Sequence, residues 1–434
     1  MAFKFFEKLV DPFPPPAPER SPSSVYRFCR HHAKGLEPFL LAMALLSTAI
    51  AIVEVYLFDL MGQLVDILTS ETPESFWSGP GTDLLWLALA VVIAYPILVG
   101  ISSLLLHQTL MGNFPMLVRW KTHRYLLRQS LGFFQDEFAG RIATRVMQTS
   151  LAVRSTVIKL LDIMVYVSVY FLSVLVLLGT MDLRLMLPML FWLICYVGLL
   201  YVIVPRLQRI SEKQADARAT MTGRIADSYT NISTVKLFSH ARRESAYARE
   251  GMEDFLGTVH PQMRLVTWME TGVAINNTIM LVAVGLTAIY LWFLGSITPG
   301  AIAVGIALCL RLNGISEWIM WEVSDLFENV GTVKDGAGAI SRHIAVEDAQ
   351  DAGALIAGQG AIHFQQLGFS YSQNRPVFKG LDLDIKPGEK VGVIGRSGAG
   401  KSTLVNLLLR FYDLDSGSIR VDGQDIRSVT QNSL

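Results

Sequence analysis

Stretches without any charged residue constrain this chain more than any other feature of its sequence. A helix needs about 20 mostly apolar residues to cross the hydrocarbon core of a membrane. Residues 271–310 form 40 positions without a charge, which is enough for two crossings, and the breaker at 295–300 divides them. Four other charge-free stretches lie at 38–53, 84–118, 163–181 and 185–205. The first of these apolar stretches continues past Glu54 to Leu60. We therefore predict six transmembrane helices.

The composition agrees with a membrane protein and excludes several other classes. Apolar residues make up 51% of the 434 residues and charged residues 17%, whereas soluble domains carry about 25% charge. So much apolar surface excludes an intrinsically disordered chain. The 37 basic and 37 acidic residues cancel, which gives no support for a nucleic-acid partner. Three cysteines far apart indicate neither a disulfide framework nor a cysteine metal site.

The positions of Lys and Arg predict how these helices are oriented. Cytoplasmic connections of membrane proteins carry an excess of both residues. Six of them precede the first span, and the connections at 113–154 and 205–264 carry seven and ten. The connections at 69–83 and 295–300 carry none. We expect a multi-pass protein of the plasma (inner) membrane, with both termini and both long connections in the cytoplasm.

The two long connections are expected to be helical. No proline occurs between Pro205 and Pro261, or between Pro115 and Pro188, so the spans can continue as helices well beyond the bilayer. One interpretation is a solvated bundle that merely connects the spans. The other is a lever that carries motion to a cytoplasmic domain. Long connections without breakers usually have a function, which favours the lever.

A region with the pattern of β-strands begins at residue 361. Apolar residues alternate with polar ones around 362–364 and at 381–385, and the apolar run 391–394 is typical of a buried strand. Residues 326–360 are rich in Gly, Ala and charge, and we predict that they are a linker. The predicted organisation is a cytoplasmic arm at 1–35, a membrane domain at 36–325, this linker, and a domain at 361–434.

A phosphate-binding loop follows the run 391–394, and its sequence fits G-x-x-x-x-G-K-[ST]. Glycines let backbone N–H groups surround an anionic phosphate, and the helix expected at about 402–412 adds the positive end of its dipole. Lys401 is expected to reach the β- and γ-phosphates of ATP, and the Ser402 hydroxyl to coordinate Mg²⁺. The predicted nucleotide-binding residues are Gly395, Arg396, Ser397, Gly398, Ala399, Gly400, Lys401, Ser402 and Thr403.

These features together resemble an ATP-binding cassette (ABC) exporter half-transporter, in which a permease domain is fused to an ATPase domain. The resemblance implies an α-helical polytopic membrane domain followed by an α/β P-loop domain, and a dimer with a second half-transporter subunit. It also implies ATP-driven export of a lipid, drug or peptide-like substrate across the lipid bilayer. The motifs that carry it, besides the six spans, are Phe369-Ser370-Tyr371, the loop at 395–403, Arg410-Phe411-Tyr412-Asp413, Ser416-Gly417 and Asp422-Gly423.

The same resemblance implies roles for residues that the sequence pattern alone leaves open. The stretches around Phe133 and Thr230 would lie in or near the coupling helices, which in this family dock on the ATPase domains. Tyr371 would stack on the adenine ring of ATP. The alternative for Tyr371 is a buried tyrosine at the end of a strand.

The chain departs from this family in the length of its ATPase region, which has 74 residues at 361–434. This is far short of a cassette ATPase domain. The Q-loop glutamine, the Walker B aspartate, the catalytic glutamate, the signature motif and the switch histidine are not found, so we assign no catalytic residue. We expect a chain truncated within its ATPase domain that does not turn over ATP alone. The alternative functions are a membrane-anchored nucleotide-binding or regulatory fragment without ATPase activity, and a passive structural fragment.

Arg311 is the basic residue that we expect deepest in the membrane, about 18 Å from the outer end of the sixth span at 1.5 Å per residue. An arginine there costs about 2.5–3.5 kcal/mol on insertion scales. It either lines the translocation cavity and meets an anionic or amphipathic substrate, or pairs with a carboxylate or carbonyl of a neighbouring helix. Glu54 is expected near the outer end of the first span, within reach of water. Asn276 and Asn277 are expected to form hydrogen bonds between helices.

Overall fold

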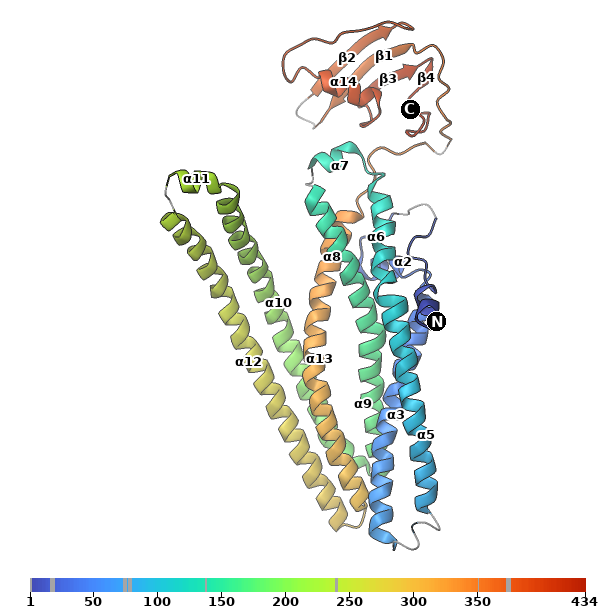
Figure 1. The fold of residues 1–434 in the computed structure, drawn as a ribbon, viewed down its shortest axis with the longest axis vertical. Helices are drawn as coiled ribbons and strands as arrows, with labels where there is room; N and C mark the ends of the chain where they lie inside the picture. The colour runs from blue at the N-terminus through green and yellow to red at the C-terminus, as the bar shows by residue number, and fades with distance from the viewer. Residues whose placement is uncertain are drawn as a thin grey trace. The chain divides into compact units, whose positions relative to one another are not determined.

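The computed structural model describes residues 2–15, 20–72, 76, 80–136, 139–238, 241–349, 351–371 and 376–434. The chain divides into two compact units (Figure 1). The first, which we call the helical unit, comprises Met1–Asp11, Ala33–Pro115 and Ala152–Val333. The second, which we call the sheet unit, comprises Pro12–His32, Met116–Leu151 and Lys334–Leu434. Each unit is described by itself.

Six helical segments among the described residues are long and apolar enough to cross a membrane, which confirms the predicted number. The two shortest have 34 and 41 residues, longer than the roughly 20 that a bilayer requires, so the expected extension beyond the membrane is also confirmed. The six segments are Glu37–Ser70, Gly81–Leu126, Arg141–Met181, Leu183–Thr230, Arg242–Phe293 and Pro299–Ile340.

The prolines of the sequence lie both at helix starts and inside helices, since Pro96, Pro205 and Pro261 do not end the helices that contain them. Proline stands at or near the start of α3, α5 and α13, where its fixed φ suits the first turn. Two π-helical stretches, Leu104–Met111 and Lys159–Ile163, interrupt the long segments. The helices are α1 (Ala2–Glu7), α2 (Val25–His32), α3 (Glu37–Ser70), α5 (Pro80–Ser103), α6 (Asn113–Leu126), α7 (Leu131–Asp136), α8 (Ala139–Ile158), α9 (Met164–Met181), the short 3₁₀ turn Leu183–Leu185, α10 (Met186–Thr230), α11 (Ile232–Leu237), α12 (Ala241–Phe293) and α13 (Pro299–Ile340).

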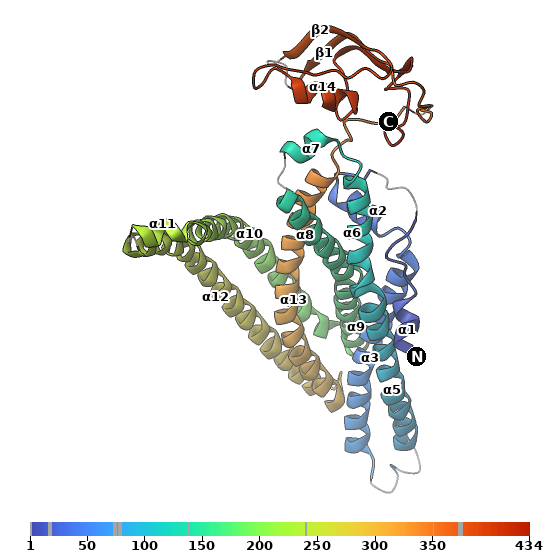
Figure 2. The ribbon, with the colours of Figure 1, turned by 45° about the horizontal axis from the view of Figure 1, so that its top comes forward.

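The helices α10 and α12 run side by side, and α11 joins them at one end (Figures 1 and 2). α10 has 45 residues, or about 68 Å at 1.5 Å per residue, more than twice the roughly 30 Å of a hydrocarbon core. The connection at 205–264 is therefore a helical hairpin, as the absence of proline between Pro205 and Pro261 predicted.

Asparagine side chains connect three helices inside the helical unit. Asn277 of α12 accepts a hydrogen bond from Trp192 Nε1 of α10 at 2.8 Å, and it donates to Asn313 Oδ1 and Ser316 Oγ of α13 at 2.6 and 2.8 Å. The neighbouring Asn276 donates to the Trp192 carbonyl at 3.2 Å. These contacts confirm the predicted bonds between helices, which hold registry where apolar packing alone is non-directional.

The start of α13 packs very closely against α3. A Cβ placed on Gly300 would lie 2.2 Å from the Gly62 carbonyl oxygen, so any larger residue would push the two helices apart. Asp66 of α3 caps α13 at the same place, because its carboxylate accepts from Thr298 Oγ1 and from the Gly300 N–H, both at 2.7 Å. We call this contact the Gly62–Gly300 junction.

The sheet unit contains a four-stranded antiparallel sheet with the strand order β2-β1-β3-β4. Its strands are β1 (Ile362–Ser370), β2 (Pro376–Ile385), β3 (Ser416–Val421) and β4 (Gln424–Asp425). Gln366, at φ +47°, bulges from β1, so the core-facing positions change from Phe364 to Leu367 and Phe369. The helix α14 (Lys401–Leu408) packs Leu404 and Leu407 against these side chains. The strands predicted around 362–364 and at 381–385 are thus present, as parts of β1 and β2.

The buried strand that we predicted at residues 391–394 does not form. The structure has no regular secondary structure there, and Ile394 is 96% exposed. A buried strand in an α/β domain needs hydrogen-bonded neighbours on both sides. The four described strands pair only with one another, so this apolar run has no neighbour among them.

The predicted linker at 326–360 begins as a helix, since α13 continues to Ile340. One of its glycines, Gly336, allows close packing there, because a Cβ at this position would clash with Thr149 Oγ1 of α8. At its other end, Asp422 accepts hydrogen bonds from the backbone N–H groups of Gly358, Gly360 and Ala361 at 2.8–2.9 Å. Part of the predicted linker is therefore ordered by specific contacts.

Candidate functional site

The phosphate-binding loop turns at two glycines that no other residue could replace without strain. Gly398 and Gly400 have φ of +82° and +90°, in the left-handed region that favours glycine. A Cβ on Gly400 would also lie 2.8 Å from Val377 Cγ1 and 2.9 Å from Phe378 Cζ of β2. Gly400 immediately precedes α14, so the loop delivers the chain directly into the helix N-terminus. This is the geometry that presents backbone N–H groups to an anion.

Lys401 holds the two ends of this loop together. Its Nζ donates hydrogen bonds to the carbonyl oxygens of Gly395 and Arg396 at 2.8 and 2.9 Å, so the ammonium group lies over the loop. The residues present therefore fit a phosphate group, with a cation, glycines and a helix N-terminus at one place.

The position expected to hold Mg²⁺ offers one hydroxyl. Ser402 is exposed at the first turn of α14, where an oxygen ligand is accessible. Mg²⁺ in such sites takes a serine or threonine oxygen together with a carboxylate and phosphate oxygens. Within the described residues no group of three or more His, Cys, Asp or Glu side chains could hold a metal ion. The chain supplies one ligand here, and the nucleotide would have to supply others.

Tyr371 lies beside the phosphate-binding loop. Its hydroxyl is 3.1 Å from Thr403 Oγ1, the last residue of the predicted nucleotide site. Its ring packs edge-on against Phe369 and Tyr412, with centroids 4.9 and 5.3 Å away. The side chain is 51% exposed, so it is not the buried strand-end tyrosine of our alternative. An aromatic face next to the loop remains open to a nucleotide base.

Arg410, the first residue of the motif at 410–413, is a central residue of the sheet unit, a role that the resemblance did not assign to it. It is 3% exposed, and its Nη1 donates to the carbonyls of Ile426 and Val429 at 3.3 and 3.2 Å. Its Nη2 donates to the Glu347 carbonyl at 2.8 Å, and its Nε pairs with Asp413 at 3.2 Å. The helix α14 ends at Leu408, so our prediction that it continues to about residue 412 is wrong. Arg410 lies beyond this end, with a φ of +50° that is not helical.

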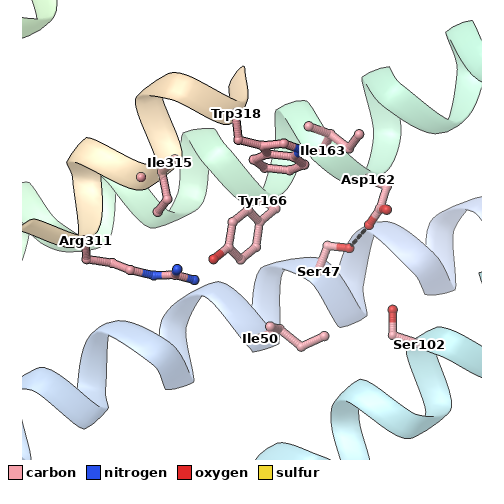
Figure 3. A pocket seen from close by; sticks show the side chains of 10 residues that line it. Ser47, Ile50, Ser102, Asp162, Ile163, Tyr166, Arg311, Ile315 and Trp318 are labelled. Atoms are coloured by element: carbon pink, nitrogen blue, oxygen red, sulfur yellow. Dashed lines mark hydrogen bonds between the residues drawn. The ribbon is translucent and has the colours of Figure 1, made fainter. Parts of the chain in front are cut away.

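A second candidate site is a cavity of about 510 Å³ in the helical unit. Figure 3 shows side chains from α3, α5, α9 and α13 around it, including Arg311, Tyr166 and Trp318. Its walls combine isoleucines with aromatic rings and a few polar groups. This is the typical lining of a small-molecule site, and the volume falls in the range of about 300–1,000 Å³ for such sites.

Arg311 lines this cavity and is paired with a carboxylate of a neighbouring helix, which confirms the second alternative; its contact with a substrate stays a prediction. Its guanidinium forms a salt bridge with Glu54, which also accepts a hydrogen bond from the Tyr166 hydroxyl. Our expectation that Glu54 reaches water is wrong, because its side chain is only 12% exposed. A membrane-embedded arginine needs such a partner, and a carboxylate on the first span supplies it.

Comparisons with known proteins identify the family of both parts of the chain. A family model described as "ABC transporter transmembrane region" matches residues 38–315, and one described as "ABC transporter" matches residues 378–434. An uncharacterized ABC transporter ATP-binding protein of Haemophilus influenzae is 44% identical over 433 residues, which cover 100% of this chain and 70% of that protein.

More distant relatives match over shorter shares of their length. An ATM1-type heavy metal exporter of Novosphingobium aromaticivorans is 30% identical over 56% of this chain and 40% of that protein. A putative multidrug export ATP-binding/permease protein of Staphylococcus aureus is 28% identical over 73% of this chain and 55% of that protein.

The fold has a counterpart among solved structures. A bacterial Atm1-family ABC exporter with ATP bound superimposes with a TM-score of 0.72 at 22% identity, over 93% of this chain and 69% of that chain. At this identity the likeness shows a shared fold. Together with the transmembrane family model, which alone covers more than half of the sequence, it leads to one conclusion: this chain belongs to the ABC transporter family.

Proposed function

We propose that this chain is one subunit of an ATP-driven exporter that moves a lipid, drug or peptide-like substrate outward across the plasma (inner) membrane, with both termini in the cytoplasm. The observation that carries the proposal is the presence, in one chain, of six membrane-length helices and a phosphate-binding loop with an ordered lysine. The names of two relatives, a heavy metal exporter and a putative multidrug export protein, support export.

In this proposal the loop at 395–403 holds ATP. Lys401 would leave the Gly395 and Arg396 carbonyls and bind the β- and γ-phosphates, while Tyr371 offers its exposed face to the adenine ring. Ser402 would be one ligand of Mg²⁺, which neutralises phosphate charge when it is bound. The second half-transporter subunit, identical or related, would complete the transport pathway.

We further propose that residues 1–434 alone bind ATP without turning it over. Hydrolysis needs a positioned water and complete metal ligation in addition to phosphate binding. The described surroundings of the loop supply a cation and a hydroxyl but no carboxylate within a metal-binding group. This supports the alternative of a membrane-anchored nucleotide-binding or regulatory chain without ATPase activity of its own.

The test measures ATP binding and turnover separately, on the purified full chain in lipid. Photo-cross-linking of an azido-ATP should label the parent protein and not Lys401→Ala. Phosphate release by the parent should equal that of Lys401→Ala. Absence of labelling would contradict the proposed function, and phosphate release clearly above the Lys401→Ala level would contradict the proposed lack of turnover. Activity restored by a full-length partner would support a heterodimer.

A further inference from the structure

The cavity of the helical unit contains a carboxylate that no cation neutralises. Asp162, in the π-helical stretch before α9, accepts a hydrogen bond from the Ser47 hydroxyl of α3 (Figure 3). No salt bridge of Asp162 occurs within the described part of the chain. Arg311 is the single basic residue among the described residues that line the cavity, and Glu54 already pairs with it.

The charged side chains at and beside the cavity carry a net negative charge. Lys159 lies three residues before Asp162, and it forms salt bridges with both Glu322 and Asp325 of α13. Its single positive charge therefore meets two negative ones. Arg311 and Asp162 line the cavity, and their nearest ion-paired neighbours bring the count to two basic and four acidic side chains, an excess of two negative charges: Lys159 and Arg311 against Glu54, Asp162, Glu322 and Asp325. An anionic ligand would be repelled here, and a cation attracted.

Two aromatic rings stand in the same wall of the cavity. Tyr166 and Trp318 meet edge to face, with centroids 6.5 Å apart at 72° (Figure 3). The polar edges of both rings are occupied, since the Tyr166 hydroxyl donates to Glu54 and Trp318 Nε1 donates to Glu322 Oε1 at 3.1 Å. Both rings line the cavity, and the faces of aromatic rings attract organic cations.

From these contacts, and resting on the proposed export function, we propose that the cavity binds an amphipathic monovalent organic cation. Its charge would lie against Asp162, and its apolar groups against Tyr166, Trp318 and Ile315. A metal ion fits poorly, because Ca²⁺ takes six to eight oxygen ligands, and the lining offers one carboxylate with the hydroxyls of Ser47 and Ser102 as its small oxygen donors.

The test uses tetraphenylphosphonium as the probe, on the full chain in nanodiscs of zwitterionic lipid without ATP. Equilibrium binding of the radiolabelled probe should weaken about tenfold in Asp162→Asn, which corresponds to about 1.4 kcal/mol. Asp162→Glu, which keeps the charge, should stay close to the parent. Asp59→Asn is the matched control, because Asp59 is another aspartate of the helical unit and does not line the cavity.

A second pair of variants keeps the inference testable if Asp162→Asn does not fold. Trp318→Leu should lower the affinity for the probe about threefold or more, whereas Trp292→Leu, an exposed tryptophan of α12, should leave it unchanged. Unchanged binding of the probe in both Asp162→Asn and Trp318→Leu would overturn the inference. Tetraphenylborate, an anion of the same shape, provides a second check. If Asp162→Asn weakened its binding as much as it weakens binding of the cation, the inference would also be overturned. Azido-ATP labelling of the same samples separates this outcome from failure of the proposed function, because labelling does not depend on the cavity.

Discussion

The Tyr412 hydroxyl donates a hydrogen bond to Gln135 Oε1 at 2.6 Å, across 277 residues of sequence. Gln135 belongs to α7, and Tyr412 lies after α14 in the part of the sheet unit that carries the phosphate-binding loop. A Cβ on Gly132 of α7 would approach the Tyr412 ring to 3.2 Å, so the helix packs on the ring as well. α7 is the segment for which the resemblance implied docking on an ATPase domain.

This contact predicts a specific chemical cross-link. With the three native cysteines replaced by serine, Gln135→Cys and Tyr412→Cys together should be joined by a short bismaleimide, because their side chains meet in the fold. A mobility shift on denaturing gels measures the link. Each single variant is the control, and a double variant that behaves like the singles would show that α7 does not rest on Tyr412.

Lys401→Ala should weaken ATP binding by about tenfold or more, since it removes the cation that lies over the loop. Titration with a fluorescent ATP analogue measures the change. Lys386→Ala is the matched control, because Lys386 is an exposed lysine of the turn before the loop. Equal affinity in the two variants would contradict the assignment of Lys401.

Arg410→Met should lower the unfolding free energy of the sheet unit by about 3 kcal/mol, because the carbonyls of Ile426, Val429 and Glu347 lose a buried donor. Limited proteolysis over a urea gradient measures the loss. Arg420→Met, at an exposed position of β3, should change stability by no more than about 0.5 kcal/mol. If both variants behave alike, Arg410 is not the anchor that its contacts indicate.

Asp422 is expected to make the stability of the sheet unit fall at acid pH. Hydrogen bonds from the N–H groups of Ala361, Gly360 and Gly358 hold the pKa of its carboxyl below the ordinary value. Because the pKa of Asp422 is lower in the folded protein than in the unfolded chain, its ionised carboxylate stabilises the fold at pH values above the unfolded pKa of about 4. This stabilisation is lost as the pH falls through the pKa of the folded protein. Urea midpoints measured from about pH 6 to pH 3 should fall less in Asp422→Asn than in the parent. Parallel curves would exclude this role.

The orientation of the chain predicts a pattern of cysteine labelling. Ser70→Cys and Ser296→Cys, in connections without Lys or Arg, should react with an impermeant maleimide in intact cells. Thr234→Cys, on α11 of the hairpin rich in basic residues, should react only after lysis. The reverse pattern would invert the proposed topology. The expectation for residues 73–75 and 77–79 of the first connection lies outside the described residues.

Features that depend on local composition could be predicted from the sequence, and features that depend on distant neighbours could not. The six spans follow from charge-free length, and the loop at 395–403 follows from glycine spacing, because each property belongs to a short segment. The pairing of Glu54 with Tyr166 joins residues 112 apart, and no periodicity connects them. Residues 391–394 show the opposite error, since their apolar pattern predicts a strand but a strand also requires neighbours.

The Gly62–Gly300 junction makes the displacement caused by a tilt of α13 unequal along the length of this helix. With α13 fixed to α3 there, a tilt of about 5° displaces a point on α13 in proportion to its distance from the junction. At 1.5 Å per residue, Arg311 is about 17 Å away and moves by about 1.5 Å, whereas Asp325 is about 38 Å away and moves by about 3 Å. The larger displacement acts on the salt bridge of Lys159 with Asp325, and the smaller one on the salt bridge of Arg311 with Glu54. One close contact between two glycines thus makes the far end of α13 the part that a tilt displaces most.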